Sequence, residues 1–256
     1  MNQKDKVISI LLAEDGYLEK KSNKNLDDKT ANAGANNFTK YSRDLDALKT
    51  FYNGPKQGFA WCDVFVDWGF VKAFGVEEAK RLLCQPSKSC GAGVGYSADY
   101  YKAKGQFHES QPQAGDQIFF KDSKGSITHT GLVHNVDKTY VYTIEGNTSS
   151  ASGVVANGGS VRHKKYKLNY SLIAGYGRPN YVEEREEFEV AKTYKNGSTS
   201  EPVYSETTLK TKTGSLDPYE VCECLGIVNG RYLVKYKVNG TSNYKCGFVK
   251  YAGGVK

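Results

Sequence analysis

The sequence is poor in cysteine and proline, with 6 residues of each among 256. Six cysteines in a chain of this length exclude a disulfide scaffold. The scarcity of proline, with 39% hydrophobic and 12% aromatic residues, excludes bulk disorder and suffices for one large core or two smaller ones. No apolar run approaches the length of a membrane span, so we expect no transmembrane segment.

Long runs of one charge are also absent, although the net charge is +7. Because the basic residues are spread along the chain and no nucleic-acid-binding motif is found, we expect no nucleic-acid partner. The excess is typical of a solvated surface, and a mild positive field also suits an anionic polymer.

A secretion signal is lacking as well. The polar segment Met1–Lys6 precedes a short apolar run, Val7–Ala13, which Glu14 and Asp15 interrupt at once. This run is too short for the hydrophobic region of a signal peptide with its cleavage site. We therefore expect synthesis in the cytoplasm and export by another route.

The first half of the chain has a helical pattern. Val64, Phe65, Trp68 and Val71 recur at helical spacing, and Gly75 follows where a helix would end. The pattern predicts four helices, over residues 3–15, 44–52, 61–73 and 76–83.

From Ala114 the pattern changes to short β-branched and aromatic runs, separated by Gly, Asp and Asn. These runs predict strands at residues 118–120, 128–136, 140–144 and 172–177. Helices first and antiparallel strands later are typical of an α+β domain, which we place at residues 1–182.

Residues 183–189 contain five Glu and one Arg and are predicted to form an exposed acidic linker. Beyond it, residues 190–256 are predicted to be all-β, with strands at residues 202–204, 219–227, 232–236 and 247–251. Asn229-Gly230 and Asn239-Gly240 are hairpin signals. A domain of this size with short strands predicts a small barrel.

Cys62 stands at the predicted start of the third helix, in Gly58-Phe59-Ala60-Trp61-Cys62-Asp63. A helix N-terminus stabilises a thiolate, and the upstream glycine lets the chain turn sharply into the helix. The alternative is a buried core cysteine on an apolar helix, since free cysteines are commonly buried.

His129 favours the catalytic interpretation. A cysteine nucleophile needs an imidazole to take its proton, and the imidazole needs a polar partner that fixes its tautomer. His129 lies on one predicted strand, and the next strand ends in Ile144-Glu145-Gly146-Asn147. Either Glu145 or Asn147 is a suitable partner.

Strand parity turns this idea into a structural requirement. With a three-residue hairpin loop, Val136 pairs with Tyr140, and His129 faces Asn147 with Glu145 on the same face. A two-residue loop would place Glu145 on the opposite face. The site therefore requires the odd register or a bulge.

The other histidines are expected to have no catalytic role. On an extended strand His134 points away from His129. His108 and His163 lie among turn residues, in segments that we expect to be loops.

The order Cys62, His129, Glu145-Gly146-Asn147 resembles the CHAP family of cysteine peptidases and amidases, a branch of the papain-like fold. The segment Gly115-Asp116-Gln117-Ile118-Phe119-Phe120 before the histidine and the closing Gly175-Tyr176-Gly177-Arg178-Pro179 also resemble it. The resemblance covers about residues 5–181. It implies a papain-like catalytic domain in which Cys62 is the nucleophile and His129 the base. It also implies that Glu145 and Asn147 orient the imidazole.

Two features depart from that family. Many members have Gln before the cysteine, where this chain has Trp61, so a second oxyanion donor beside the Cys62 backbone N–H is unassigned. Some members bind calcium in an acidic loop, but residues 53–58 contain no carboxylate, and the pair Asp27-Asp28 is weak evidence for a site. We predict no metal and no cofactor.

The remaining cysteines suggest no further chemistry. Cys84 and Cys90 flank a loop that can close as a disulfide outside the cell, although cytoplasmic synthesis favours free thiols at first. Cys222, Cys224 and Cys246 match a zinc site poorly and are predicted to be half-buried strand residues.

The C-terminal domain resembles the bacterial SH3 modules of wall hydrolases in its architecture. This resemblance implies a partner in the bacterial cell wall. Seven tyrosines offer stacking surface, of which we expect about half in the core. They are Tyr194, Tyr204, Tyr219, Tyr232, Tyr236, Tyr244 and Tyr251.

Together these patterns predict a peptidoglycan hydrolase that cuts an amide bond, either between muramic acid and L-Ala or within the peptide stem or cross-bridge. A wall-binding module without a signal peptide is typical of a phage or prophage endolysin, released through a holin pore or by lysis. The alternatives are a wall-binding protein with an inactive papain-like domain, and a toxin or transamidase that acts on proteins.

Overall fold

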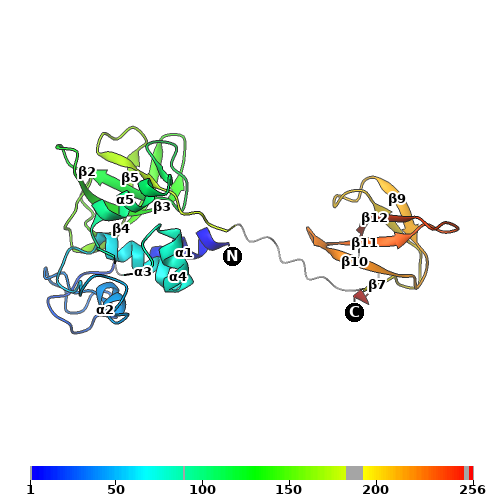
Figure 1. Ribbon diagram of the computed structural model, residues 1–256, viewed down its shortest axis with the longest axis horizontal. Coiled ribbons are helices and arrows are strands. Elements are labelled where there is room, and N and C mark those ends of the chain that lie inside the picture. The colour runs from blue at the N-terminus through cyan, green and yellow to red at the C-terminus, as the bar shows by residue number, and fades with distance from the viewer. Residues whose placement is uncertain (1, 89, 183–192, 251–253, 256) are drawn as a thin grey trace. The chain divides into compact units, whose positions relative to one another are not determined.

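The computed structural model describes residues 2–88, 90–182, 193–250 and 254–255 (Figure 1). The chain divides into two compact units, Met1–Glu183 and Glu184–Lys256. The predicted acidic linker, residues 183–189, lies outside the described residues. No helix in the described part of the chain is both long enough and apolar enough to cross a bilayer.

The N-terminal unit is an α+β fold, as predicted. Its helices are α1 (Gln3–Leu12), α2 (Lys40–Asp46), α3 (Cys62–Phe74), α4 (Val76–Leu82) and α5 (Val94–Ala103). The first, third and fourth agree with the helical spacing of the sequence, and α5 was not predicted.

The predicted helix over residues 44–52 is wrong. Helix α2 begins earlier because the Thr39 hydroxyl accepts a hydrogen bond from the Ser42 N–H at 3.0 Å, which caps the first turn. It ends by Ala47, and Lys49 adopts a left-handed φ of 53° that a helix does not allow.

The sheet of this unit is antiparallel, with strand order β1-β6-β2-β3-β4-β5. Its strands are β1 (Phe107–His108), β2 (Gln117–Lys121), β3 (Ile127–Val136), β4 (Tyr140–Thr148), β5 (Ser160–Lys167) and β6 (Ile173–Gly177). The expectation that His108 and His163 lie in loops is wrong, because His108 is in β1 and His163 is in β5. Strand β5 escaped prediction because five of its eight residues are Lys, Arg or His and it buries few apolar side chains.

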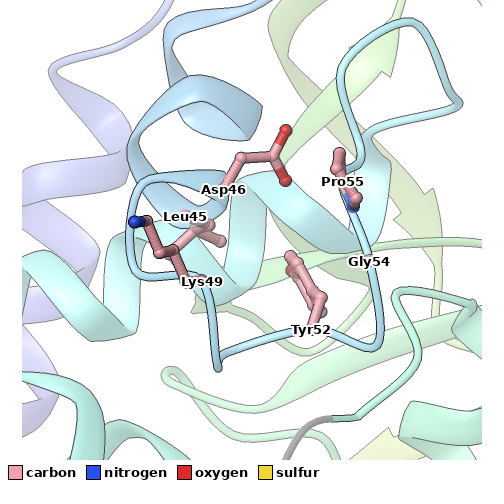
Figure 2. A pocket seen from close by; sticks show the side chains of 6 residues that line it. All are labelled: Leu45, Asp46, Lys49, Tyr52, Gly54 and Pro55. Atoms are coloured by element: carbon pink, nitrogen blue, oxygen red, sulfur yellow. The ribbon is translucent and has the colours of Figure 1, made fainter.

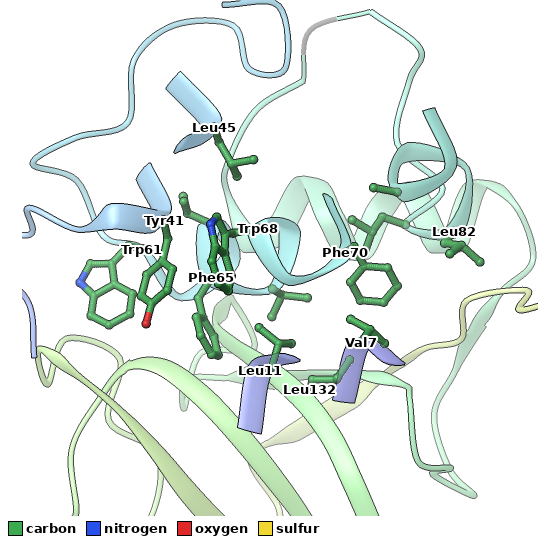
Figure 3. Close-up of a cluster of buried hydrophobic side chains, with 14 of the residues drawn as sticks. Val7, Leu11, Tyr41, Leu45, Trp61, Phe65, Trp68, Phe70, Leu82 and Leu132 are labelled. Carbon is green, nitrogen blue, oxygen red and sulfur yellow. The ribbon is translucent and has the colours of Figure 1, made fainter. Parts of the chain in front are cut away.

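Helix α3 lies at the centre of the core, with ten of its thirteen residues buried. Val7 and Leu11 of α1, Tyr41 of α2 and Leu132 of β3 surround it (Figure 3). A second cluster, which includes Phe120, lies apart from this helical core. Because β2 and β3 contribute side chains to both clusters, the sheet is covered on both faces.

The β3–β4 hairpin has an irregular register. Val136 pairs with Val141 and not with Tyr140, so the loop is not the three-residue loop considered from the sequence. A bulge between Val133 and Asn135 then shifts the register, and Leu132 pairs with Ile144. Beyond the bulge the pairing is therefore the one that a three-residue loop predicts.

The C-terminal unit is a single antiparallel sheet with strand order β13-β7-β10-β11-β12-β8-β9. Its strands are β7 (Thr193–Lys195), β8 (Glu201–Tyr204), β9 (Lys212–Leu216), β10 (Val221–Val228), β11 (Arg231–Lys237), β12 (Tyr244–Val249) and β13 (Gly254–Val255). Asn229 and Gly230 both have left-handed φ angles and join β10 to β11 as predicted. Tyr194 and Tyr236 are buried, whereas Tyr219 and Tyr244 are exposed.

Candidate active site

Cys62 is the first residue of α3, and its side chain is 5% exposed. The helix begins where the Phe65 N–H donates to the Trp61 carbonyl at 2.9 Å. The N–H groups of the first turn have no acceptor within the helix, so this end of α3 can donate hydrogen bonds to an anion.

Trp61 is buried in the core, and its indole N–H points to a residue other than Cys62. Its indole N–H donates to the Glu19 carboxylate at 2.9 Å, and both side chains are buried. Its ring packs against Tyr41 and Phe65. Trp61, which replaces the glutamine found in many CHAP proteins, therefore uses its one side-chain donor to bind Glu19.

Gly146 lets the start of α3 approach the sheet closely. A Cβ there would lie 2.5 Å from the Phe65 Cβ and 2.9 Å from the Trp61 Cζ3, so any larger residue would push the helix away from β4. This contact brings Cys62 to the strand end that carries the predicted polar pair.

His129 and Glu145 meet in the interior, and neither is exposed. The imidazole Nε2 lies 2.9 Å from the Glu145 Oε2. The ring stacks on Phe120, which pairs with His129 from the neighbouring strand β2, at 5.9 Å between ring centroids. Glu145 is therefore the polar partner of the imidazole.

Gly131 makes this contact possible. A Cβ at position 131 would lie 2.5 Å from the Glu145 Cγ. Because no side chain intervenes, the glutamate crosses β3 at Gly131 and reaches His129.

Two residues that sequence reasoning missed hold the Glu145 carboxylate. The Thr143 hydroxyl donates to Oε1 at 2.6 Å, and the Tyr166 hydroxyl donates to Oε2 at 3.2 Å. Burial and the nearby glutamate raise the pKa of Tyr166 far above its usual range, so the phenol remains a donor. Thr143 was identifiable by parity, two residues before Glu145, whereas Tyr166 belongs to the unpredicted β5.

Cys62 is the second partner of the imidazole. Burial lowers the pKa of His129, but the interactions with Cys62 and Glu145 outweigh burial and raise it to about 10. Glu145 occupies Nε2, and Nδ1 has no hydrogen-bond partner among the described residues, so Nδ1 is the ring nitrogen that remains available to Cys62. The site favours an imidazolium beside Cys62 at neutral pH.

Asn147 lies at the same strand end but contacts a different group. Its side-chain oxygen accepts the Gly159 N–H at 3.2 Å, and its backbone has a left-handed φ of 53°. Among the described residues its amide nitrogen has no hydrogen-bond partner. Asn147 therefore holds the following loop, and the described contacts of the imidazole go to Glu145, Cys62 and Phe120.

Asp63, next to Cys62, is fully buried beneath the helix start. It accepts hydrogen bonds from the Ser97 hydroxyl at 2.8 Å and the Gln117 amide at 3.1 Å. Burial raises the pKa of Asp63 to about 6. These bonds tie the first turn of α3 to α5 and β2, and so fix the position of Cys62.

The loop before Cys62 is stabilised by an acidic residue of α2. Asp46 points its carboxylate into a small pocket lined also by Tyr52 and Pro55 (Figure 2). Its two oxygens accept the backbone N–H groups of Lys56 and Gln57 at 2.8 and 3.1 Å. This carboxylate therefore serves the loop. Within residues 2–88, 90–182, 193–250 and 254–255, no three His, Cys, Asp or Glu side chains gather as a metal site.

The other cysteines are free thiols in this structure. Burial raises the pKa of Cys84 to about 11 and that of Cys90 to about 12. Cys222 and Cys224 are buried in the C-terminal sheet, and Cys246 is exposed.

The site can now be compared with known proteins. Bacteriocin BCN5 of Clostridium perfringens is 31% identical over 139 residues, which cover 54% of this chain and 14% of the bacteriocin. The match thus spans about one seventh of that relative. Two solved structures of Ly7917, one with the hydrolyzing product of MDP, are 13% and 14% identical with TM-scores of 0.41 and 0.40. Each of the two matches covers 98% of this chain and 97% of the Ly7917 chain.

The family model of the CHAP domain matches residues 54–147. The matched segment includes the start of α3 and both strands of the β3–β4 hairpin. It contains Cys62, His129, Glu145 and Asn147, the four residues that the sequence resemblance singled out. The chain therefore carries a CHAP domain at residues 54–147.

Proposed function

We propose that this protein is a peptidoglycan hydrolase that cleaves an amide bond by Cys62–His129 catalysis. The observation that carries the proposal is the buried His129–Glu145 pair, together with Cys62 at the N-terminus of α3, all within the CHAP segment. The match to part of a bacteriocin supports an action on bacteria.

In the proposed reaction the Cys62 thiolate attacks the amide carbonyl carbon. The negative charge moves to the carbonyl oxygen, which the Cys62 backbone N–H stabilises. Collapse breaks the C–N bond, and the His129 imidazolium gives its proton to the leaving amine. A thioester remains on Cys62. Water then attacks it while neutral His129 accepts the water proton, which releases the acid and restores the ion pair.

Glu145 serves this cycle by holding the ring and stabilising its charged form. Its own position is set by Thr143 and Tyr166. Since Cys62 alone of the three has measurable exposure, substrate approaches from the sulfur side.

The finer assignments follow from the same proposal. The bond joins muramic acid to L-Ala or lies in the stem or cross-bridge. The C-terminal unit is proposed as an SH3-like wall-binding module. The proposal also takes the protein to be a phage or prophage endolysin that reaches the wall through a holin pore or by lysis.

Lysis assays on purified cell walls test the catalytic pair. We expect Cys62→Ala and His129→Ala to lower the cleavage rate by a factor on the order of 10³ or more. Cys90→Ala, which removes a similarly buried thiol outside the site, is the matched control. Undiminished cleavage by either site variant would refute the assignment. Mass spectrometry of the new termini identifies the bond.

Wall sedimentation separates the proposal from its alternatives. The full-length Cys62→Ala protein is expected to sediment with purified walls. A chain that stays in the supernatant and cleaves only proteins would indicate a toxin or transamidase. Sedimentation of a wild-type chain that cleaves no wall would indicate an inactive binding protein.

A further inference from the structure

Two large aromatic side chains of the N-terminal unit are exposed close to Cys62. Phe59 is 64% and Tyr96 is 62% exposed. Both line a pocket of about 370 Å³ that also includes Ala60, two residues before the nucleophile. We call it the Phe59–Tyr96 pocket. An exposed aromatic ring forgoes the hydrophobic free energy that burial would provide. Two such rings that line the same pocket therefore indicate a binding surface.

One wall of the pocket is an extended glycine-rich segment, Gly91–Gly93. The ring of Tyr96 packs directly on it, because a Cβ at Gly91 would lie only 2.9 Å from the Tyr96 Cδ2. Just before it, Cys90 forms a bridge with Tyr52, and its carbonyl accepts the Asn53 N–H at 2.8 Å. Beyond this bridge, neither the N–H nor the C=O of Ala92 has a hydrogen-bond partner among the described residues.

The pocket has one charged side chain. Among its nine lining residues Lys56 is a cation, and none is an acid. The Lys56 ammonium donates to the Asn53 side-chain oxygen at 2.7 Å and has further donors for a ligand. A carboxylate therefore suits this pocket better than a cation or a fully neutral ligand.

We propose that the Phe59–Tyr96 pocket binds the peptide arm of peptidoglycan next to the scissile amide. An extended peptide pairs with the unused backbone groups of Ala92, lies between the two rings, and places a carboxylate at Lys56. The inference rests on the proposed function, because the pocket's nearness to Cys62 selects the substrate as its occupant. A glycan ring would use the aromatic faces but not the strand-like backbone or the ammonium.

Steady-state kinetics on soluble wall fragments test this assignment. We expect Phe59→Ala, Tyr96→Ala and Lys56→Gln each to raise KM roughly tenfold with kcat nearly unchanged. Tyr96→Phe keeps the ring and should retain the wild-type KM. Leu168→Ala and Lys138→Gln, from a pocket of about 310 Å³ lined by the β3–β4 and β5–β6 loops, are the matched controls.

A binding assay identifies the ligand class. Full-length Cys62→Ala is titrated with a fluorescent synthetic stem peptide, with the same peptide after its carboxylates are amidated, and with a peptide-free glycan. We expect the free-carboxylate peptide to bind most tightly and Lys56→Gln to abolish its advantage over the amidated form. Equal binding of both peptides, or preference for the glycan, would overturn the inference.

The two proposals fail in different ways. A wild-type protein that cleaves no wall fragment contradicts the hydrolase, whatever the pocket binds. A wild-type protein that cleaves them, with pocket variants that match the Leu168→Ala and Lys138→Gln controls in KM, contradicts the pocket assignment and leaves the hydrolase intact.

Discussion

Cys62 at the start of α3 and Cys90 in the loop before α5 are almost equally buried, with 5% and 3% exposure. Their neighbours differ. The Cys90 sulfur lies 3.4 Å from the Phe51 carbonyl oxygen, and burial raises the pKa of this thiol to about 12. Cys62 lies instead at a helix N-terminus and interacts with His129.

This difference shows that burial alone favours an inert thiol. Removing a sulfur from water disfavours its charged form. A cationic imidazole and a helix N-terminus favour the charged form at the same degree of burial. A reactive cysteine is therefore recognised by its partners and not by its exposure. Experiments can test the difference in reactivity that this predicts between Cys62 and Cys90.

The largest expected difference is in alkylation. At neutral pH, iodoacetamide should modify Cys62 at least about a thousandfold faster than Cys90, because the thiolate is the reacting form. The exposed Cys246 is replaced in a Cys246→Ser background so that it does not consume reagent. Peptide mapping by mass spectrometry gives the rate at each site.

His129→Ala in the same background is the control for this comparison. It removes the cation, so Cys62 should lose most of its advantage while the rate at Cys90 stays constant. Equal rates at the two cysteines in the parent protein would show that the imidazole does not activate Cys62.

A smaller effect is expected when Glu145 is replaced by Gln. The pKa of His129, raised to about 10, keeps the imidazolium through neutral pH, and activity falls as pH rises through that value. Glu145→Gln removes one group that raises the pKa, so the alkaline limb of kcat/KM should move to lower pH. At neutral pH we expect a fall on the order of 10².

The pH profile distinguishes this role from simple loss of packing. Glu78→Gln removes a carboxylate that pairs with Arg81 at the surface, and should leave the alkaline limb in place. A Glu145→Gln profile that falls in height without moving would mean that Glu145 positions the ring but does not stabilise its charge.

Sequence patterns predicted the parts of the fold that follow one periodicity. Helical spacing located α3 and thereby the position of Cys62 at its start. Strand parity required an odd register or a bulge, and the structure has a bulge, beyond which Leu132 pairs with Ile144 in the register of a three-residue loop. Helix α2 was misplaced because a single hydrogen bond at Thr39 decides where it begins.

The candidate site was predictable where it depends on local chain order and not where it depends on distant strands. Glu145 was a candidate by parity, but Tyr166, which donates to it, comes from the lysine-rich β5. Asn147 has the right parity, yet its left-handed backbone accompanies a side chain bonded to Gly159. Alternation alone does not reveal such a turn.

The smallest effect on the difference in reactivity between Cys62 and Cys90 is expected from a substitution at Gly131, because this residue contacts neither thiol. In Gly131→Ala the new Cβ would lie 2.5 Å from the Glu145 Cγ and 2.9 Å from the Ile144 carbonyl oxygen, so both β4 and the Glu145 carboxylate must shift away from their present positions beside β3. We expect a roughly tenfold slower wall cleavage and Cys62 alkylation, with Cys90 unaffected. Gly95→Ala, whose Cβ meets no atom within 4 Å, controls for an added methyl group. Wild-type reactivity in Gly131→Ala would show that the imidazole keeps its charge without contact to Glu145, and Cys62 alone would then account for the raised pKa.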